Sequence, residues 1–337
     1  DGMEYITLAD GSRLRGTGRS IRPDLDERLL TFLVSYGMFV VKSRQEETTM
    51  EISGHTQMLC LIGSPVGHSG SPAMYNYSFQ KLGLDYAYLA YDIKEEETAE
   101  AVKALRLLNV KGFNITMPCK TAALACCDEL SRAAELIGAV NTVVNENGKL
   151  IGHNTDGMGW VRNCRENGFE ITGKKMTIAG SGGAATAIEI TAALEGMREI
   201  SIFARKDSFF ANAEATVEKI RKYVPACTVN LFDLDDQEAF RKEVADSDIF
   251  TNATRVGMKP MDDQSLITDS GLFRKDLVVS DVVYNPRETK LLKEAAAAGC
   301  KTIPGIGMLL WQGAEAFKLY TGQEMPAQEV MDKYFAE

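Results

Sequence analysis

The sequence predicts an α/β protein with two domains, each built around a mostly parallel sheet. From about Gln57 onward, short apolar runs alternate with longer helix-type stretches, and such alternation is typical of βαβ units. A glycine-rich turn at residues 180–183 lies directly between an apolar run and a helix-type stretch. The length of 337 residues is enough for about two domains of common size.

The first half of the chain predicts four strands that alternate with three helices. The expected strands span residues 58–63, 86–93, 112–117 and 139–144, and the expected helices span residues 71–82, 95–108 and 121–129. Three glutamates at residues 95–97 favour a helix start, because carboxylates are stabilised at the positive end of the helix dipole. Residues 1–55 show no such alternation, and "GSRLRGTGRS" (11–20) indicates a loop.

The second half predicts a longer series of strands and helices that begins at Lys175. The expected strands span residues 175–180, 199–204, 228–232, 249–252, 277–284 and 301–303. The expected helices span residues 183–194, 208–223, 236–245, 288–298 and 308–319. We expect the boundary between the two domains at a hinge near residues 156–161.

Composition argues against several classes of protein. The formal charge of −10 and the isoelectric point near 5.1 argue against nucleic-acid binding, which uses a basic surface. The apolar run at residues 29–41 is shorter than the ~20 residues of a membrane span and lacks the flanks of a secretory signal, so we expect a cytoplasmic protein that does not bind membranes. Seven cysteines without a C-x-x-C pair are expected to be reduced thiols. Three histidines without i, i+4 partners predict no metal site.

The segment "KMTIAGSGGAAT" places Gly180, Gly182 and Ala185 in the spacing G-x-G-x-x-G/A. The spacing alone is weak evidence, but the strand before it and the helix after it form the context that dinucleotide binding requires. Gly180 would permit a tight turn, Gly182 would let the backbone approach a pyrophosphate, and Ala185 would let the helix pack closely on the sheet. N–H groups at the helix start would then bind the phosphates. The alternative is a plain strand–turn–helix connection.

The next expected strand ends in "FARKDS", which carries two opposing signals for the kind of dinucleotide. Asp207 lies 22 residues past Ala185, near the place where an acid binds the ribose 2′-hydroxyl of NAD. Arg205 and Lys206 are cations that either bind the 2′-phosphate of NADP or lie on the surface. Because a carboxylate repels a phosphate dianion, NAD use or dual use is favoured over strict NADP use.

Polar residues lie at the ends of expected strands in the first half. Lys120 follows an apolar strand in "NITMPCK", and Asn141 and Asp156 stand in "GAVNTVVN" and "GHNTDGMGW". Ligands of parallel α/β sheets collect at strand ends, and a lysine can exchange a proton beside an aspartate within hydrogen-bond reach. The alternatives are a lysine that reaches water and an aspartate in a turn or cap. Ser69 and Ser71 either cap a helix or bind a carboxylate or polyol.

Taken together, these segments resemble the shikimate dehydrogenase family, and most of all its quinate/shikimate dehydrogenase branch. The matching stretches follow the family's order over about residues 57–325: "LIGSPVGHSGSPAMYN", "GFNITMPCK", "GAVNTVVN", "GHNTDGMGW", "AGSGGAAT", "TNATRVGMKP", "DVVYNPRETKLL" and "GMLLWQGAEAF". The branch is favoured by "ARKD", "TRVGM" and "LLWQGAEAF". The residues before Met50 have no counterpart in the family pattern.

The resemblance implies a domain division and a set of site residues. It implies a substrate-binding domain at 56–156 plus 308–337, a Rossmann-type NAD(P)-binding domain at 157–307, and an extension of unassigned role at 1–55. Lys120 and Asp156 would be the catalytic pair. The substrate would contact both of these and Ser69, Ser71, Tyr88, Thr116, Asn141 and Gln312. The cofactor would contact Gly180, Ser181, Gly182, Gly183, Ala184, Ala204, Arg205, Lys206, Asp207, Arg255, Val282, Val283, Tyr284, Asn285 and Gly305.

The activity implied by the resemblance is reversible, NAD(P)-dependent oxidation of shikimate to 3-dehydroshikimate, and the branch adds oxidation of quinate to 3-dehydroquinate. The pathway implied is aromatic amino-acid biosynthesis or quinate use. One alternative is a non-catalytic sensor of a dinucleotide and a hydroxy acid, which would not need to retain Lys120 and Asp156. Another is a dehydrogenase of aminoshikimate or a related cyclitol acid. The expected partner is the small-molecule substrate, with a homodimer as an option.

Overall fold

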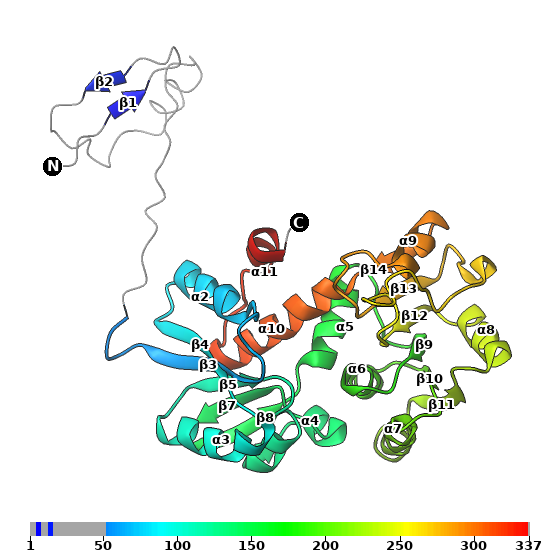
Figure 1. The fold of residues 1–337 in the computed structure, drawn as a ribbon, viewed down its shortest axis with the longest axis horizontal. Coiled ribbons are helices and arrows are strands. Elements are labelled where there is room, and N and C mark those ends of the chain that lie inside the picture. The colour runs from blue at the N-terminus through cyan, green and yellow to red at the C-terminus, as the bar shows by residue number, and fades with distance from the viewer. Residues whose placement is uncertain (1–4, 8–12, 16–51, 336–337) are drawn as a thin grey trace. The chain divides into compact units, whose positions relative to one another are not determined.

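The computed structural model describes residues 5–7, 13–15 and 52–335. The chain forms two compact units, Asp1–Thr49 and Met50–Glu337. In the first unit, strands β1 (Tyr5–Thr7) and β2 (Arg13–Arg15) pair in the antiparallel direction (Figure 1).

Strand β2 lies inside the segment 11–20, which the sequence predicted to be a loop, so that prediction is wrong for residues 13–15. The pairing with β1 satisfies backbone groups that a loop would leave to water. The other residues of this segment and the apolar run 29–41 lie outside the described residues. Among the residues that the structure describes, no helix combines the length and the hydrophobicity needed to cross a bilayer.

The second unit contains two six-stranded sheets, and the first has the strand order β4-β3-β5-β7-β8-β6. Its strands are β3 (Gln57–Gly63), β4 (Tyr86–Asp92), β5 (Gly112–Ile115), β6 (Glu129–Leu130), β7 (Thr142–Glu146) and β8 (Lys149–His153). Strand β3 pairs in parallel with β4 and β5, whereas β7 pairs antiparallel with β5 and β8. Every residue of β5 is buried, as expected for a strand that is covered on both faces.

The helical segments of this first half are α2 (Ser71–Leu82), η1 (Glu95–Glu97), α3 (Thr98–Leu107), η2 (Ala122–Cys126) and α4 (Arg132–Ile137). Helix α2 has the predicted bounds because Pro72 stands in its first turn and Gly83 ends it in the left-handed conformation. The predicted helix 121–129 is wrong in its second part, because Cys127 is extended and leads into β6. The sequence analysis did not predict α4, whose N-cap Ser131 accepts a hydrogen bond from the Ala134 N–H.

The second sheet has the strand order β11-β10-β9-β12-β13-β14, with all neighbours parallel. Its strands are β9 (Lys175–Ala179), β10 (Glu199–Ala204), β11 (Thr228–Asp233), β12 (Ile249–Asn252), β13 (Val278–Asp281) and β14 (Lys301–Ile303). The surrounding helices are α6 (Gly183–Leu194), α7 (Phe210–Tyr223), α8 (Gln237–Ala245), η3 (Ser270–Leu272) and α9 (Lys290–Ala297). This is the strand order of a Rossmann sheet, in agreement with the predicted fold class.

Helices α5 (Asp156–Glu166) and α10 (Gly305–Thr321) pack side by side between the two sheets (Figure 1). We expected a hinge at residues 156–161, but this segment is the first part of α5. Its glycines permit close packing instead. A Cβ on Gly159 would lie 2.6 Å from the backbone nitrogen of Gln312 in α10, and a Cβ on Gly157 would overlap the hydroxyl of Thr191 in α6. The chain ends in α11 (Ala327–Val330) and a short turn of π-helix, η4 (Met331–Phe335).

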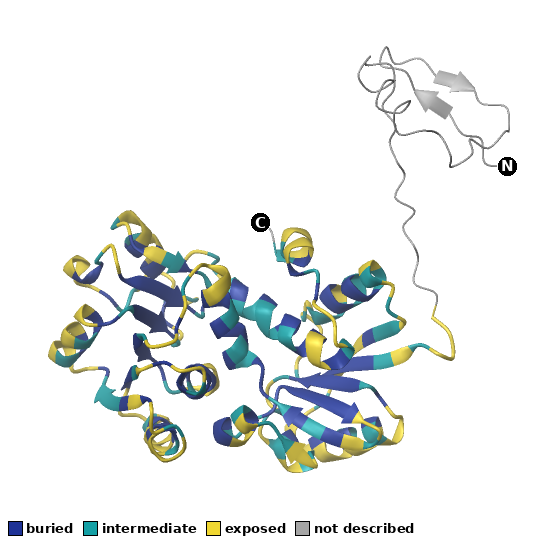
Figure 2. Cartoon of the chain, turned by 180° about the vertical axis from the view of Figure 1, so that it is seen from behind, coloured by how far each residue is buried: buried dark blue, intermediate teal, exposed yellow. Residues whose placement is uncertain are grey.

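The strands of both sheets are largely buried, and the helices expose their outer faces (Figure 2). Two apolar clusters join segments that are distant in sequence. Leu136 and Ile137 of α4 pack in one cluster with residues of β9, β10 and α6. Phe317 of α10 packs in another with Tyr75 and Phe79 of α2. Helix α4 of the first half thus packs with the second sheet and its helix α6, and α10 of the last part packs with α2 and the first sheet.

Candidate active site

A cleft of about 1280 Å³ opens between the two sheets of the second unit. Its lining includes Thr116 and Lys120 after β5, Asp156 at the start of α5, Gly183 at the start of α6 and Tyr284 after β13. Segments that follow strands of both sheets therefore contribute to one site. Ligands of α/β sheets bind at this edge.

The cleft brings together many of the residues that the sequence singled out. Those in its lining are Ser69, Ser71, Thr116, Lys120, Asn141, Asp156, Gly183, Ala184, Val282, Tyr284, Asn285, Gly305 and Gln312. The remaining predicted site residues are described by the structure but do not line the cleft: Tyr88, Gly180, Ser181, Gly182, Ala204, Arg205, Lys206, Asp207, Arg255 and Val283.

Lys120 and Asp156 form an ion pair in the cleft. The Lys120 ammonium donates to Oδ2 of Asp156 over 2.6 Å, and the two side chains are 28% and 18% exposed. The Lys120 carbonyl accepts from the Val140 N–H at 3.0 Å, which ties the turn after β5 to the segment before β7. The pair is within hydrogen-bond reach and open to the cleft, as a proton-transfer pair must be.

Asn141 holds the other oxygen of the Asp156 carboxylate. Its Nδ2 donates to Oδ1 of Asp156 at 2.8 Å, while its Oδ1 accepts from the Thr155 N–H at 2.8 Å. The Asp156 N–H donates to Oδ1 of Asn154 at 3.1 Å. The bond from Asn141 to Oδ1 orients the carboxylate so that Oδ2 faces Lys120, and the other two bonds hold the backbone at the start of α5.

A polar network continues from Asn141 into the core. The Thr142 hydroxyl donates to Oδ1 of Asn141, and Nδ2 of Asn114 donates to the Thr142 hydroxyl. The Tyr88 hydroxyl donates to Oδ1 of Asn114 at 2.8 Å. Tyr88 is fully buried and lies behind this network, whereas Asn114 lines the cleft. The sequence analysis did not select Asn114, although an asparagine in an apolar strand must find hydrogen-bond partners.

Ser69, Ser71 and Gln312 contribute uncharged polar groups to the cleft. The Ser69 hydroxyl accepts from the Ser71 N–H at 3.2 Å, which stabilises the turn before α2. Gln312 donates from Nε2 to the Leu309 carbonyl of its own helix at 3.0 Å. Its place on α10 depends on Gly159, because any larger residue there would push α10 away from α5.

The turn between β9 and α6 has the features of a phosphate loop. Gly180 has a φ of 138°, and a Cβ on it would lie 2.6 Å from the Ala253 carbonyl oxygen, so only glycine fits. Gly182 and Gly183 have open space where a Cβ would stand, and no side chain caps α6. The first N–H groups of α6 are thus open to a ligand, and this cradle fits the pyrophosphate of a dinucleotide.

Residues 205–207 follow β10, the neighbour of β9 in the sheet. Lys206 forms an ion pair with Asp233 at 3.3 Å, and Oδ1 of Asp207 accepts from the Phe209 N–H at 2.8 Å. Arg205 has no hydrogen-bond or ion-pair partner in the described part of the chain. Both an acid and an unpaired cation therefore stand where the ribose of a dinucleotide would lie.

Asp281 anchors the loop that follows β13. Its Oδ1 accepts from the Val283 N–H and from Nδ2 of Asn252, both at 2.9 Å, and its Oδ2 accepts from the Thr289 hydroxyl at 2.7 Å. Burial raises the pKa of Asp281 to about 6, and these hydrogen bonds limit the rise. The Thr289 hydroxyl also accepts from the Leu292 N–H, which caps α9. The segment between residues 282 and 289 is thus held at both ends.

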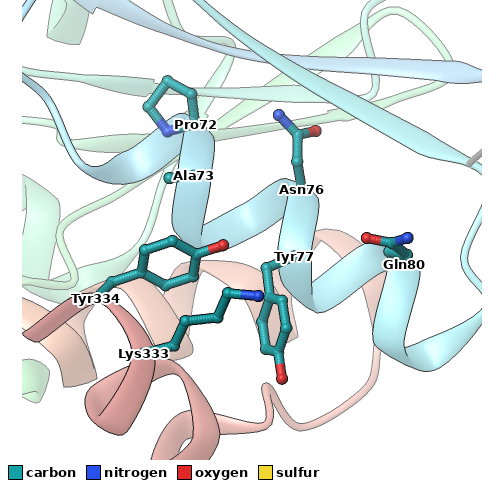
Figure 3. Close-up of a pocket in the computed structure, with 7 residues that line it drawn as sticks. All are labelled: Pro72, Ala73, Asn76, Tyr77, Gln80, Lys333 and Tyr334. Atoms are coloured by element: carbon teal, nitrogen blue, oxygen red, sulfur yellow. The ribbon is translucent and has the colours of Figure 1, made fainter. Parts of the chain in front are cut away.

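A second hollow of about 380 Å³ lies between α2 and η4 and shares no residue with the cleft (Figure 3). Tyr77 and Lys333, which line this hollow, already interact with other side chains of the protein. Tyr77 donates to Glu329 at 2.8 Å, and the Lys333 ammonium lies 4.5 Å from the centre of the Tyr77 ring. The cleft, with its ion pair and phosphate loop, is therefore the candidate active site.

Comparisons with known proteins identify the family of this chain. The model of the shikimate dehydrogenase substrate binding domain matches residues 61–143, and that of the shikimate 5'-dehydrogenase C-terminal domain matches residues 305–333. A shikimate dehydrogenase (NADP(+)) of Listeria monocytogenes serotype 4b is 53% identical over 287 residues, which are 85% of this chain and 98% of the relative. The chain belongs to the shikimate dehydrogenase family. A relative of the same description from Streptococcus uberis is 54% identical over 84% of this chain and 97% of its own length.

Solved structures of this family have the same fold. Shikimate 5-dehydrogenase from Listeria monocytogenes, in complex with shikimate and NAD, is 53% identical with a TM-score of 0.82, covering 84% of this chain and 98% of its own. Quinate dehydrogenase from Corynebacterium glutamicum, in complex with NAD, is 30% identical with a TM-score of 0.75, covering 83% and 99%. Shikimate 5-dehydrogenase from Thermus thermophilus, in complex with NADP(H) and shikimate, is 33% identical with a TM-score of 0.69, covering 82% and 97%.

Proposed function

We propose that this protein catalyses the reversible, NAD(P)-dependent oxidation of shikimate to 3-dehydroshikimate. The observation that carries the proposal is the 2.6 Å ion pair of Lys120 and Asp156, which lines the same cleft as the open start of α6. The high identity to shikimate dehydrogenases over nearly their whole length supports the same conclusion.

Lys120 is the proton-transfer residue of this mechanism. A bound nicotinamide dinucleotide supplies the hydride acceptor for oxidation and the hydride donor for reduction. In reduction, the Lys120 ammonium gives its proton to the carbonyl oxygen of the ring as that oxygen gains charge, and in oxidation the amine takes the hydroxyl proton back. Asp156, oriented by Asn141, keeps the Lys120 side chain in place and accepts a hydrogen bond from the substrate hydroxyl.

The remaining residues of the cleft bind and orient the two ligands. Ser69 and Ser71 bind the ring carboxylate, and Thr116, Asn141 and Gln312 bind ring hydroxyls. Tyr88 contributes through Asn114, to which its hydroxyl is bonded, because it does not touch the cleft.

The dinucleotide lies along the carboxyl ends of the second sheet. Its pyrophosphate is bound by the backbone of residues 180–184, and its adenosine ribose lies beside residues 204–207. The rest of the dinucleotide lies along Arg255, residues 282–285 and Gly305. With Asp207 for a 2′-hydroxyl and the unpaired Arg205 for a 2′-phosphate, we propose that the protein uses NAD or both NAD and NADP.

Quinate is a second candidate substrate, because a quinate dehydrogenase shares 30% identity and the fold. Steady-state kinetics with shikimate and quinate, each with NAD and NADP, tests both substrate and cofactor. We expect kcat/KM to be highest with shikimate, and measurable turnover with NAD. Absence of turnover with all four pairs would sink the proposal in favour of a sensor or of an enzyme for a related cyclitol acid.

We also propose that residues 56–156 with 308–337 form the substrate-binding domain and residues 157–307 the dinucleotide-binding domain. Two sheets with separate strand orders support this division. A cytoplasmic location fits the seven free cysteines, because thiols stay reduced there.

A further inference from the structure

Arg287 is a cationic side chain of the cleft that has no hydrogen-bond or ion-pair partner among the residues that the structure describes. It lines the cleft, and its Nη1 atom is buried without a hydrogen-bond partner. No ion pair and no cation–π contact is found for it among the described residues either. A buried donor that stays unpaired costs about 1–3 kcal/mol, and more when it is charged. Such groups are therefore rare in folded proteins, and a ligand group is a natural partner.

The charges in the cleft favour an anion. The ionised side chains of its lining are Lys120, Lys219, Arg287 and Asp156, so cations outnumber carboxylates although the whole chain carries a formal charge of −10. Lys120 is paired with Asp156, and the Lys219 ammonium donates to the Leu136 carbonyl at 2.7 Å. Arg287 retains an unmatched charge within the described cleft.

The strand that precedes Arg287 limits which ligand groups its side chain can reach. It follows β13, which lies three strands away from β10 in the order β10-β9-β12-β13. Three strand spacings are roughly 14 Å, so the strand before Arg287 is well separated from the strand before Arg205, and we expect Arg287 to meet a group other than a 2′-phosphate beside Arg205. Arg287 lies instead on the loop after β13, which lines the cleft at Val282 and Tyr284. Its backbone is held by Asp281 and Thr289 on either side, so the side chain starts from a fixed point.

We propose that Arg287 binds an anionic oxygen group of a ligand in the cleft. The group is the carboxylate of the ring acid or the pyrophosphate of the dinucleotide. The serines proposed for the ring carboxylate carry no charge, and Arg287 supplies a cation that can bind two oxygens of one carboxylate or phosphate. This inference rests on the proposed function and adds a specificity residue to it.

The test uses the full chain with Arg287→Gln, which removes the charge and keeps most of the length, and Arg287→Lys, which keeps a charge. Calorimetry measures the Kd of shikimate, and fluorescence titration measures the Kd of NADH. Both readouts are independent of turnover. We expect Arg287→Gln to weaken one of the two ligands roughly 10- to 100-fold, as for a lost hydrogen bond to a charged group, and Arg287→Lys to restore part of the loss.

Two further comparisons of binding identify the ligand group that Arg287 contacts. If it meets the ring carboxylate, Arg287→Gln raises the Kd and KM of shikimate, and the preference for shikimate over its methyl ester shrinks. If it meets the pyrophosphate, the Kd of NADH and of NADPH rise by the same factor. Lys290→Gln is the matched control, because Lys290 is an exposed cation three residues along that does not line the cleft. It should leave both Kd values unchanged.

Unchanged Kd values for shikimate and NADH in Arg287→Gln would overturn the inference while leaving the proposed function intact. An equal loss in Lys290→Gln would also overturn it, since the effect would then come from net charge. If the wild-type protein binds these ligands but turns over neither shikimate nor quinate, the proposed function fails and the Arg287 arms still decide the inference. If the wild-type protein binds neither ligand, both the proposed function and the inference about Arg287 are wrong.

Discussion

Two lysines of this protein meet carboxylates at opposite ends of strands, and their surroundings differ. Lys120 follows the carboxyl end of β5, has Asp156 as its one ion-pair partner in the described structure, and is 28% exposed. Lys175 is the first residue of β9 and only 4% exposed. Its ammonium contacts three carboxylates at 2.8–3.0 Å, those of Glu199, Glu243 and Asp246.

The partners of Lys175 hold its proton firmly. Burial alone would lower the pKa of this lysine, but the hydrogen bonds that its ammonium donates to Asp246, Glu243 and Glu199 outweigh burial and raise the pKa above its usual value. Lys175 also stands at the amino end of its strand, one strand length from the phosphate loop that follows Ala179. Ligands bind at the other edge of the sheet.

The difference teaches that a lysine–carboxylate pair is not by itself a sign of catalysis. A lysine that is saturated with carboxylates and closed to solvent stabilises the fold. A lysine with one carboxylate, open to a cleft at the carboxyl edge of the sheet, can give its proton to a ligand. Mutations of the two residues should therefore change different properties.

Lys120→Met should show the largest effect. It removes the proton donor and keeps most of the apolar stem, so kcat should fall by about 10²–10⁴ while KM changes less. Steady-state kinetics measures both constants, and urea unfolding should give a stability close to wild type because the residue is partly exposed. A kcat near that of the wild type would remove Lys120 from the mechanism and end the comparison.

Much of the fold was predictable because local signals mark the ends of elements. Strand β10 and helices α2 and α6 have the predicted bounds. The β7–β8 hairpin was missed, although Asn147–Gly148 is a turn signal and both residues have positive φ. A hinge was predicted near residues 156–161, but this segment begins α5, and close packing on α6 and α10 requires its glycines. Such packing depends on partners far along the chain, which local patterns do not contain.

The candidate site was predictable where a residue type implies chemistry. Lys120, Asn141 and Asp156 were selected, and hydrogen bonds join them. Asn114 was not selected because it lies within an apolar strand pattern. Arg287 was not selected because cations are common in surface loops. Their exposure to the cleft results from how the two sheets are set against each other.

Lys175→Met should show the opposite pattern to Lys120→Met: a loss of stability with little change in kcat. It leaves three carboxylates together without their cation, and removing one partner of a buried ion pair costs about 3–5 kcal/mol. Urea unfolding should show this loss in the free energy of unfolding, while kcat per folded molecule stays near wild type. A large fall in kcat without a loss of stability would mean that Lys175 is linked to the chemistry and that the distinction between the two lysines is wrong.

Glu189 extends the comparison to a buried carboxyl group for which the described structure shows no partner. It lies on α6, is fully buried, and both of its carboxylate oxygens lack hydrogen-bond partners in the described structure. Burial raises its pKa from 4.5 to about 8. The folded protein therefore keeps this proton at a pH where the unfolded chain has lost it. Stability from this group is full below about pH 4.5 and is lost as the pH rises toward 8.

Glu189→Gln should remove that loss, because glutamine stays neutral at every pH and fills the same space. Each pH unit between 4.5 and 8 changes the contribution of Glu189 by up to about 1.4 kcal/mol, so the variant should gain stability over the wild type as the pH rises. Urea unfolding of both proteins at about pH 5.5 and about pH 7.5, within that window, measures the gain. The same pH dependence in both would show that Glu189 is ionised and partnered when folded. Glu189 would then resemble Lys175, whose charge is matched by partners.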